Sequence, residues 1–132
     1  MVTFLWRSVG SPAPKTTDCP FTDVSKDAYF YDAVLWAAEN GITLGVTETT
    51  FEPYTTCSRA HMVTFISRFA KGTPVGDSNN FTDVPENVYY TNPVQWAVET
   101  GVTNGTTATT FSPNNTCTRG QMVTFLYRHF EE

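Results

Sequence analysis

Two arginines stand where helices are expected to begin, and their chemistry is that of an anion site. Arg59 lies in "CSRAH" at 57–61, and Arg119 lies in "CTRGQ" at 117–121. The first N–H groups of a helix carry the positive end of its dipole, so a guanidinium beside them could hold a carboxylate. The alternative is that each arginine pairs with Asp23 or Asp83 and ties a loop to a helix. The residues alone favour that structural role.

The other reactive side chains form no catalytic set. A glycosidase needs two carboxylates about 5–10 Å apart that flank one bond. Asp23 and Asp83 occupy equivalent positions of a repeat, which is poor ground for such a pair, and turn or groove roles are favoured. His61 and His129 have no partner suggested by spacing, and no H-E-x-x-H or C-x-x-C metal pattern occurs. We therefore predict a non-enzymatic chain with no metal and no cofactor.

Two tryptophans at equivalent positions have two interpretations. Trp36 and Trp96 each lie in a short apolar segment, "AVLWAAEN" or "PVQWAVET". A single tryptophan at helical spacing with small apolar residues is more often part of a core. An exposed indole would instead stack on the C–H face of a sugar. Both interpretations stay open here, with a groove wall favoured.

The three cysteines are interpreted as packing residues. Cys57 and Cys117 directly precede the expected helix caps, where each would pack on Met62 or Met122 as a hydrophobic staple. A buried free cysteine behaves as a small hydrophobe. A Cys19–Cys57 bridge is the alternative, because an odd cysteine count in an exported protein often leaves one thiol outside a bridge. Three free thiols are the preferred interpretation.

Composition excludes several classes of protein. The 132 residues carry a net charge of −5, which argues against a nucleic-acid binder and against a surface for anionic lipids. Only 16% of residues are charged while 14% are aromatic, a balance that suits an extracellular or cell-surface module. No apolar run reaches the roughly 18 residues of a membrane helix. The first residues, "MVTFLWRSVG", lack the features of a signal peptide, so an export signal is expected elsewhere.

An internal repeat organises the chain. Residues 21–70 align with residues 81–130 without a gap, and twenty-five of the fifty aligned positions are identical. Self-similarity of this length and period indicates a repeat architecture. Residues 1–9, "MVTFLWRSV", match the ends of both copies, "MVTFISRFA" and "MVTFLYRHF". They are therefore expected to form the last helix of a third copy.

Each copy is expected to contain two helices, and the first of them is short. Asp32 and Asn92 are the predicted N-caps, with Pro93 at the first helical position, where its missing N–H costs nothing. Gly41 and Gly101 are expected to end these helices in the left-handed conformation. The preceding "FTDV" segments are expected to be short and extended.

The second helix of each copy should be amphipathic. Ser58 and Thr118 are the predicted caps. Apolar residues then recur at i, i+3, i+4 and i+7 and should face a core; they are Met62, Phe65, Ile66 and Phe69 in one copy, and Met122, Phe125 and Leu126 in the other. The sequence thus predicts an all-α protein of repeated helix–loop–helix units.

The order of these signals resembles the S-layer homology (SLH) domain of bacterial envelope proteins. It runs F-x-D-V, an aromatic residue, Trp in a short helix, G-[IV]-T-x-G, F-x-P, [ST]-R, and an apolar helix with Arg. The resemblance implies a pseudo-threefold spindle of three repeats, here with an incomplete third repeat. It assigns residues 1–10 to the final helix of a truncated repeat, 21–71 and 81–132 to full repeats, and 11–20 and 72–80 to linkers.

The resemblance also implies a function. SLH domains bind secondary cell-wall polysaccharide, often pyruvylated, in grooves between adjacent repeats, and so anchor exported proteins at the surface of Gram-positive-type bacteria. It reverses the preference stated above and makes Arg59 and Arg119 sugar-binding residues. The other implied contacts are Asp23, Trp36 and Gly45 in one copy, and Asp83, Trp96 and Gly105 in the other.

Two departures from the family pattern support an alternative function. The usual helix start of the family is I-T-R-A-E, but here His61 and Gln121 replace the acidic residue. The truncated repeat leaves at most two of the three grooves with their usual walls. The alternative is therefore a structural module that assembles with itself or with other SLH repeats and has lost sugar binding.

Overall fold

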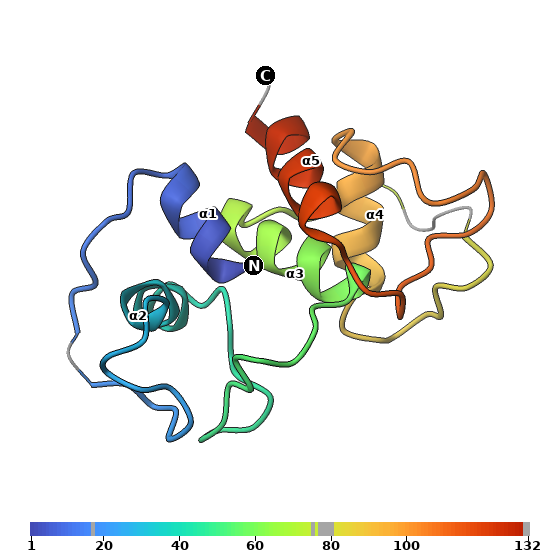
Figure 1. The fold of residues 1–132 in the computed structure, drawn as a ribbon. Helices are drawn as coiled ribbons and strands as arrows, with labels where there is room; N and C mark the ends of the chain where they lie inside the picture. Colours follow the sequence, from blue (N-terminus) through green and yellow to red (C-terminus); the bar gives the residue numbers. More distant parts are fainter. Residues whose placement is uncertain (17, 75, 77–80, 131–132) are drawn as a thin grey trace. The chain divides into compact units, whose positions relative to one another are not determined.

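The structure is a computed structural model that describes residues 1–16, 18–74, 76 and 81–130. The described residues form five α-helices, which are α1 (Val2–Ser8), α2 (Tyr31–Glu39), α3 (Arg59–Ala70), α4 (Thr91–Glu99) and α5 (Arg119–Phe130) (Figure 1). Their one β-type contact is an isolated antiparallel bridge between Ser58 and Thr116. The predicted all-α class is confirmed, and the spindle remains a prediction. The linker 72–80 lies mostly outside the described residues.

The chain divides into two compact units, Met1–Thr55 and Thr56–Glu132. In the first unit α1 packs against α2. Leu5 of α1 and both Ala33 and Val34 of α2 are fully buried. The residues at the start of the chain, expected to form the last helix of a third copy, thus form a helix that packs on the first helix of the following repeat.

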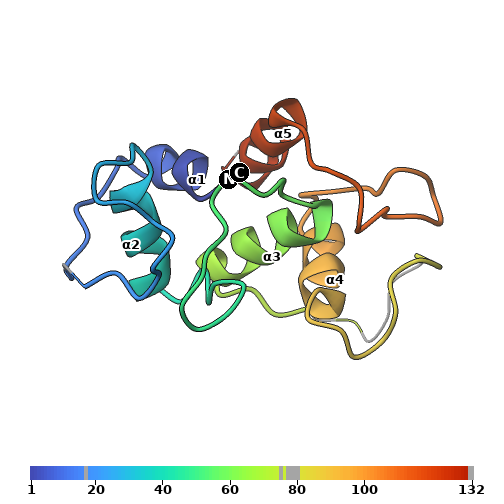
Figure 2. The same cartoon turned by 60° about the horizontal axis from the view of Figure 1, so that its bottom comes forward.

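In the second unit α3 packs against both α4 and α5, as Figures 1 and 2 show. Met62, Val63 and Ile66 of α3 are fully buried, whereas the predicted core residues Phe65 and Phe69 are only half-buried. Two neighbouring helices cover a wider part of α3 than a single stripe, which brings Val63 into the core. In α5 the predicted stripe of Met122, Phe125 and Leu126 is buried.

The predicted starts of the two short helices were wrong by two residues. Asp32 and Asn92 occupy the second helical position, and Pro93 occupies the third. In α4 the first residue, Thr91, takes over the local bonding: its hydroxyl donates to the carbonyl of Pro85 at 2.7 Å and accepts from a backbone N–H at 3.1 Å. Pro93 still lies in the first turn, where its missing N–H costs no hydrogen bond.

The predicted ends of these helices are confirmed. Gly41 follows α2 with φ +70°, and Gly101 follows α4 with φ +80°. The backbone N–H of Ile42 donates to the carbonyl of Ala37 at 2.8 Å, which together with the left-handed glycine makes a Schellman motif. The chain therefore turns sharply after each short helix and enters the long loop of its repeat.

Candidate functional site

The start of α3 is held by a reciprocal cap. The hydroxyl of Ser58 accepts from the backbone N–H of His61 at 3.1 Å, and Nδ1 of His61 accepts from the backbone N–H of Ser58 at 3.3 Å. This is a capping box, with a histidine where the family pattern has an acidic residue. Burial lowers the pKa of His61, which favours the neutral ring that can accept at Nδ1.

The start of α5 uses the same device with a different side chain. The hydroxyl of Thr118 accepts from the backbone N–H of Gln121 at 3.1 Å, and Oε1 of Gln121 accepts from the backbone N–H of Thr118 at 3.0 Å. The two replacements of the acidic residue thus keep its acceptor role and remove its negative charge from the helix start. The caps predicted at Ser58 and Thr118 are confirmed.

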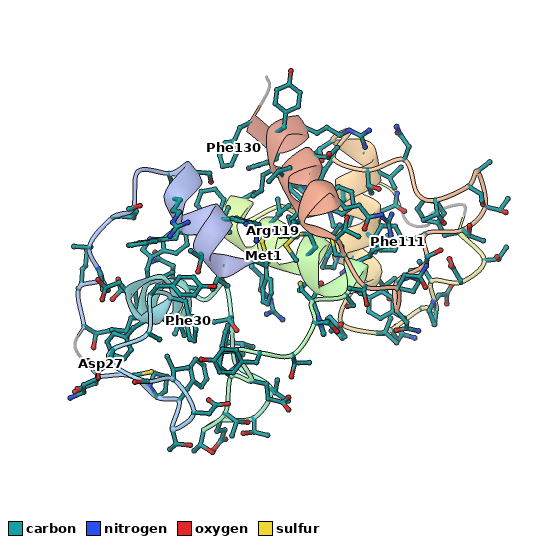
Figure 3. The ribbon with its side chains drawn as sticks, in the orientation of Figure 1. Met1, Asp27, Phe30, Phe111, Arg119 and Phe130 are labelled. Carbon is teal, nitrogen blue, oxygen red and sulfur yellow. The ribbon has the colours of Figure 1, made fainter. Side chains whose placement is uncertain are left out.

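Arg59 is a buried side chain that holds the long loop of the following repeat. It is 5% exposed, and its Nε donates to the carbonyl of Phe111 at 2.8 Å. Its guanidinium lies 4.8 Å from the ring centroid of Phe111 and 5.3 Å from that of Phe125, in cation–π geometry (Figure 3 labels Phe111). Burial lowers the pKa of Arg59. Arg59 therefore ties the loop to the helices through a backbone carbonyl and two aromatic rings, whereas the sequence suggested a pairing with Asp23 or Asp83.

The backbone donors at the start of α3 are already bonded to the same loop. The N–H of Arg59 donates to the carbonyl of Asn115, and the N–H of Ala60 donates to the carbonyl of Pro113, each at 3.0 Å. These are donors that an anion at a helix start would use. In this structure they bind the chain itself.

Arg119 is the exposed counterpart of Arg59. The bridge between Ser58 and Thr116 places the start of α5 beside the start of α3, and Arg119 is the first residue of α5 (Figures 1 and 3). Its side chain is exposed. The structure therefore separates two arginines that the repeat makes equivalent, since one is enclosed by a loop and the other is accessible.

The two aspartates clamp the backbone of their own repeats. The carboxylate of Asp23 accepts from the N–H groups of Phe51 at 2.8 Å and Glu52 at 2.7 Å. In the second copy Asp83 accepts from Phe111 at 2.9 Å and from the next N–H at 2.8 Å. The hydrogen bond from Phe51, opposed by burial, lowers the pKa of Asp23.

Residues 22–24 and 82–84 form turns, so the extended conformation predicted for "FTDV" was wrong.

The two loop glycines are required by the backbone and by a packed ring. Gly45 has φ +80° and Gly105 has φ +86°, a region that side chains rarely adopt. A Cβ atom on Gly45 would strike the ring of Phe21, and one on Gly105 would lie 2.5 Å from a ring carbon of Phe81. Both positions therefore build the loop, whether or not a ligand also approaches them.

Both tryptophans are buried, which supports the core interpretation. Trp36 and Trp96 are each 7% exposed. The ring of Trp96 lies 5.9 Å from that of His129, and Gly72 leaves no room for a side chain beside the indole. The small area that remains exposed is a narrow surface for stacking on a sugar.

The structure adds an aromatic residue that the sequence did not single out as a site. Tyr89, 53% exposed, lies on the ring of His61 with 6.1 Å between the centroids. Partial burial raises the pKa of Tyr89, and a hydrogen bond with Ser58 opposes that rise. The only signal for this residue was its identity with Tyr29 in the other copy. The start of α3 thus presents a half-exposed aromatic pair.

The predicted site residues fall into the two units. The second unit contains Arg59, Asp83, Trp96, Gly105 and Arg119, whereas Asp23, Trp36 and Gly45 belong to the first. Arg59 therefore groups with the following repeat, whose loop it holds. The sequence grouped Arg59 with Asp23 of its own repeat, but the two residues belong to different units.

Three further observations concern the described part of the chain. None of its helices is long and apolar enough to cross a membrane. Among the same residues, no group of three or more His, Cys, Asp or Glu side chains could hold a metal ion. Cys19, Cys57 and Cys117 are free thiols, with Cys117 buried and the other two half-buried.

Comparison with known proteins gives a consistent family. The pattern of the S-layer homology domain matches residues 20–63 and 80–123. The chain is 30% identical over 119 residues to the surface-layer 125 kDa protein of Lysinibacillus sphaericus, covering 89% of this chain and 10% of that protein. It is 30% identical over 114 residues to a cell surface protein of Thermoanaerobacter kivui, covering 83% of this chain and 15% of that one.

Some relatives carry enzyme names. The chain is 30% identical over 114 residues to an amylopullulanase of Thermoanaerobacterium thermosulfurigenes, covering 86% of this chain and 6% of that protein. The chain thus spans a small part of the length of each of these relatives. Both family matches begin just before "FTDV" and end within the second helix of a repeat. The chain therefore belongs to the S-layer homology domain family.

Proposed function

We propose that this chain is a non-catalytic module that anchors a larger protein to the bacterial cell envelope by binding secondary cell-wall polysaccharide. The observation that carries the proposal is the pair of SLH matches, together with the similarity to relatives named as surface-layer and cell surface proteins. The covered region amounts to 6–15% of the three relatives described above, which is the size of a module within a longer protein. The expected location is the wall of a Gram-positive-type bacterium.

We infer that Arg119 makes the direct contact with the polymer. A pyruvyl ketal carries a carboxylate, and a guanidinium forms charge-assisted, often bidentate bonds to carboxylates. Arg119 is exposed at the first residue of α5, where the helix dipole also favours an anion. Arg59 would act indirectly, because it positions the 111–117 segment that leads into α5. Roles for Asp83, Trp96 and Gly105, and for Asp23, Trp36 and Gly45, remain predictions.

The test compares arginine variants on two forms of one polymer. Binding of purified pyruvylated wall polysaccharide is measured by calorimetry, and again after mild acid has removed the ketals. A charge-assisted contact contributes about 1.5–3 kcal/mol, so Arg119→Ala should weaken binding roughly 10-fold to 100-fold. Arg128→Ala is the matched control, since Arg128 is an exposed arginine of the same helix, about 13 Å further along its axis.

Removing the ketal from the polymer and replacing Arg119 by alanine should not have additive effects on the free energy of binding. Removing the ketal from the polymer should weaken wild-type binding as much as Arg119→Ala does, and the variant should not distinguish the two polymers. Equal binding of both polymers by the wild type would refute the ketal contact. Unchanged binding by Arg119→Ala would refute the role of this residue and leave the anchoring function to be carried by another surface.

A second candidate function, assembly with other SLH repeats, is favoured by the exposed face of α5. Val123 is 51% exposed and Tyr127 is 65% exposed, whereas their counterparts in α3, Val63 and Ser67, are buried. In α3 this face packs in a core that includes α4. The same face of α5 is therefore suited to a further helix of the same kind.

A further inference from the structure

The register of the bridge between α3 and α5 brings two cysteines opposite each other. Ser58 pairs with Thr116 in antiparallel fashion. The flanking hydrogen bonds run from the N–H of Arg59 to the carbonyl of Asn115 at 3.0 Å, and from Cys117 to Cys57 at 2.8 Å. One step along each strand from the central pair, Cys57 therefore lies directly opposite Cys117.

Directly opposed residues of an antiparallel pair point to the same side of the ribbon. Cys57 and Cys117 form the hydrogen-bonded kind of pair, in which the Cα atoms lie about 5.5 Å apart. A disulfide needs Cα atoms roughly 4.4–6.8 Å apart, with the Cβ atoms facing each other. The Cα spacing of this pair therefore falls within the range that a disulfide spans. The electrostatic influence of the Cys117 thiol on Cys57 agrees with this proximity.

The two thiols differ in access. Cys57 is half-buried, and Cys117 is buried next to the guanidinium of Arg59, which lowers the pKa of that thiol while burial raises it. An oxidant in solution can thus reach Cys57 first. Cys117 is then the second thiol, close enough to react with the modified Cys57.

We propose that Cys57 and Cys117 form a disulfide when the protein meets an oxidant that itself carries a disulfide, such as a thiol–disulfide oxidoreductase or oxidised glutathione. The Cys57 thiolate attacks one sulfur of the oxidant and releases a thiolate, which leaves a mixed disulfide on Cys57. The Cys117 thiolate then attacks Sγ of Cys57 and releases the second thiolate. Two protons leave the cysteines, and the oxidant gains two electrons and becomes two thiols.

The reaction is expected to be slow near neutrality. Burial raises the pKa of Cys57 to about 11, so only about one molecule in ten thousand carries the reactive thiolate at pH 7. Raising the pH from 7 to 9 should therefore accelerate oxidation by on the order of 100-fold. The reduced state would persist until an efficient oxidant is supplied.

The experiment maps the disulfide by proteolysis. The full chain is incubated with oxidised glutathione at pH 8.5, free thiols are alkylated, and the protein is digested with trypsin without reduction. Cleavage after lysine and arginine places Cys19, Cys57 and Cys117 on the separate peptides 16–26, 27–59 and 72–119. The expected product joins 27–59 to 72–119, and Cys19 appears alkylated or glutathionylated.

A matched oxidation of the unfolded chain in guanidinium chloride tests whether the folded structure selects the Cys57–Cys117 pair. The unfolded chain should give a mixture that includes pairs with Cys19, whereas the folded chain should give the Cys57–Cys117 pair alone. The same mixture from both states, or glutathione adducts on Cys57 that never resolve, would overturn the proposal. The oxidised protein should also melt at a higher temperature than the reduced one, because the bond closes a long loop. A lower melting temperature would show that the native geometry rejects the bond.

Discussion

At the scale of single residues, the helix starts of α3 and α5 show one requirement met by two side chains. The N-cap backbone N–H needs an acceptor, and His61 supplies it in α3 while Gln121 supplies it in α5. Both helix starts stay bonded without a carboxylate. This leaves Arg119, the exposed arginine of the two, with no acidic neighbour at the third helical position, which suits it to hold an anion from outside. The histidine differs from the glutamine in one respect, because it titrates near neutrality.

His61 should make stability depend on pH. Its folded-state pKa is lowered below the ordinary 6.5, so the unfolded chain binds the proton more readily. The stabilising contribution is therefore present above pH 6.5 and is lost as the pH falls through the folded pKa. Protonation removes the Nδ1 acceptor and adds a positive charge at the helix start. As the pH falls from 7.5 to 5, the free energy of unfolding of the wild type should therefore fall relative to that of His61→Gln.

The measurement is urea unfolding of both proteins across this pH range. Glutamine is the matched replacement, because Gln121 performs the same capping role in the other repeat. The other titrating groups are common to both proteins, so only the difference between the curves reports on His61. Parallel curves would show that the histidine cap makes no pH-dependent contribution.

The contrast between Arg59 and Arg119 marks the limit of what the sequence could predict at this scale. The motif placed both arginines at the first helical residue, and the structure agrees. Their difference in burial depends on the 111–117 segment, which covers Arg59 and leads into Arg119. Equivalent positions in a repeat share local conformation but not neighbours. Exposure was therefore not predictable from the motif.

At the scale of elements, the long loop of each repeat is built by one aspartate and one glycine. Asp83 binds the N–H groups of Phe111 and Ser112, and Gly105 lets the loop close over the ring of Phe81. The loop in turn receives the Nε hydrogen bond of Arg59. A change at Gly105 should therefore disturb the surroundings of the candidate site through the loop.

Two glycines with the same backbone conformation should respond differently to alanine. Gly101 and Gly105 have φ +80° and +86°, so alanine at either position costs about 1–2 kcal/mol of left-handed strain. A Cβ on Gly101 meets nothing within 4 Å, whereas one on Gly105 meets the ring of Phe81 and the carbonyl of Thr110. Gly105→Ala should cost about 1–3 kcal/mol more than Gly101→Ala in thermal unfolding. Equal losses would mean that the ring moves aside freely.

For the two short helices, α2 and α4, the ends were easier to predict than the starts. Gly41 and Gly101 fixed the ends, because only glycine adopts the left-handed conformation without strain. The starts depended on side-chain bonds of the preceding turn, such as the bond from Thr91 to Pro85, and several polar residues there compete as caps. Propensity alone could not decide among them.

At the scale of the whole molecule, the helices that pack together come from consecutive copies of the sequence repeat. The last helix of one copy packs on the first helix of the next, as α1 does on α2 and α3 does on α4. The repeat period was evident from the sequence, but each helix partner lies in the following copy and was visible only in the structure. By the same rule, the face of α5 that corresponds to the buried face of α3 should be covered by a further helix.

That face should drive association of the protein as it stands. Val123, Tyr127 and Phe130 are 51%, 65% and 44% exposed and recur at i, i+4 and i+7, which places them on one stripe of α5. In sedimentation velocity, the sedimentation coefficient of the wild type should rise with concentration above that of a 14.7 kDa monomer. The double variant Val123→Gln/Tyr127→Gln should remain monomeric, because glutamine keeps helix propensity and removes the apolar surface. The matched control Leu44→Gln/Val46→Gln alters two exposed apolar residues of a loop and should still associate. A wild type that stays monomeric at every concentration would exclude self-association through α5 and weaken the assembly function.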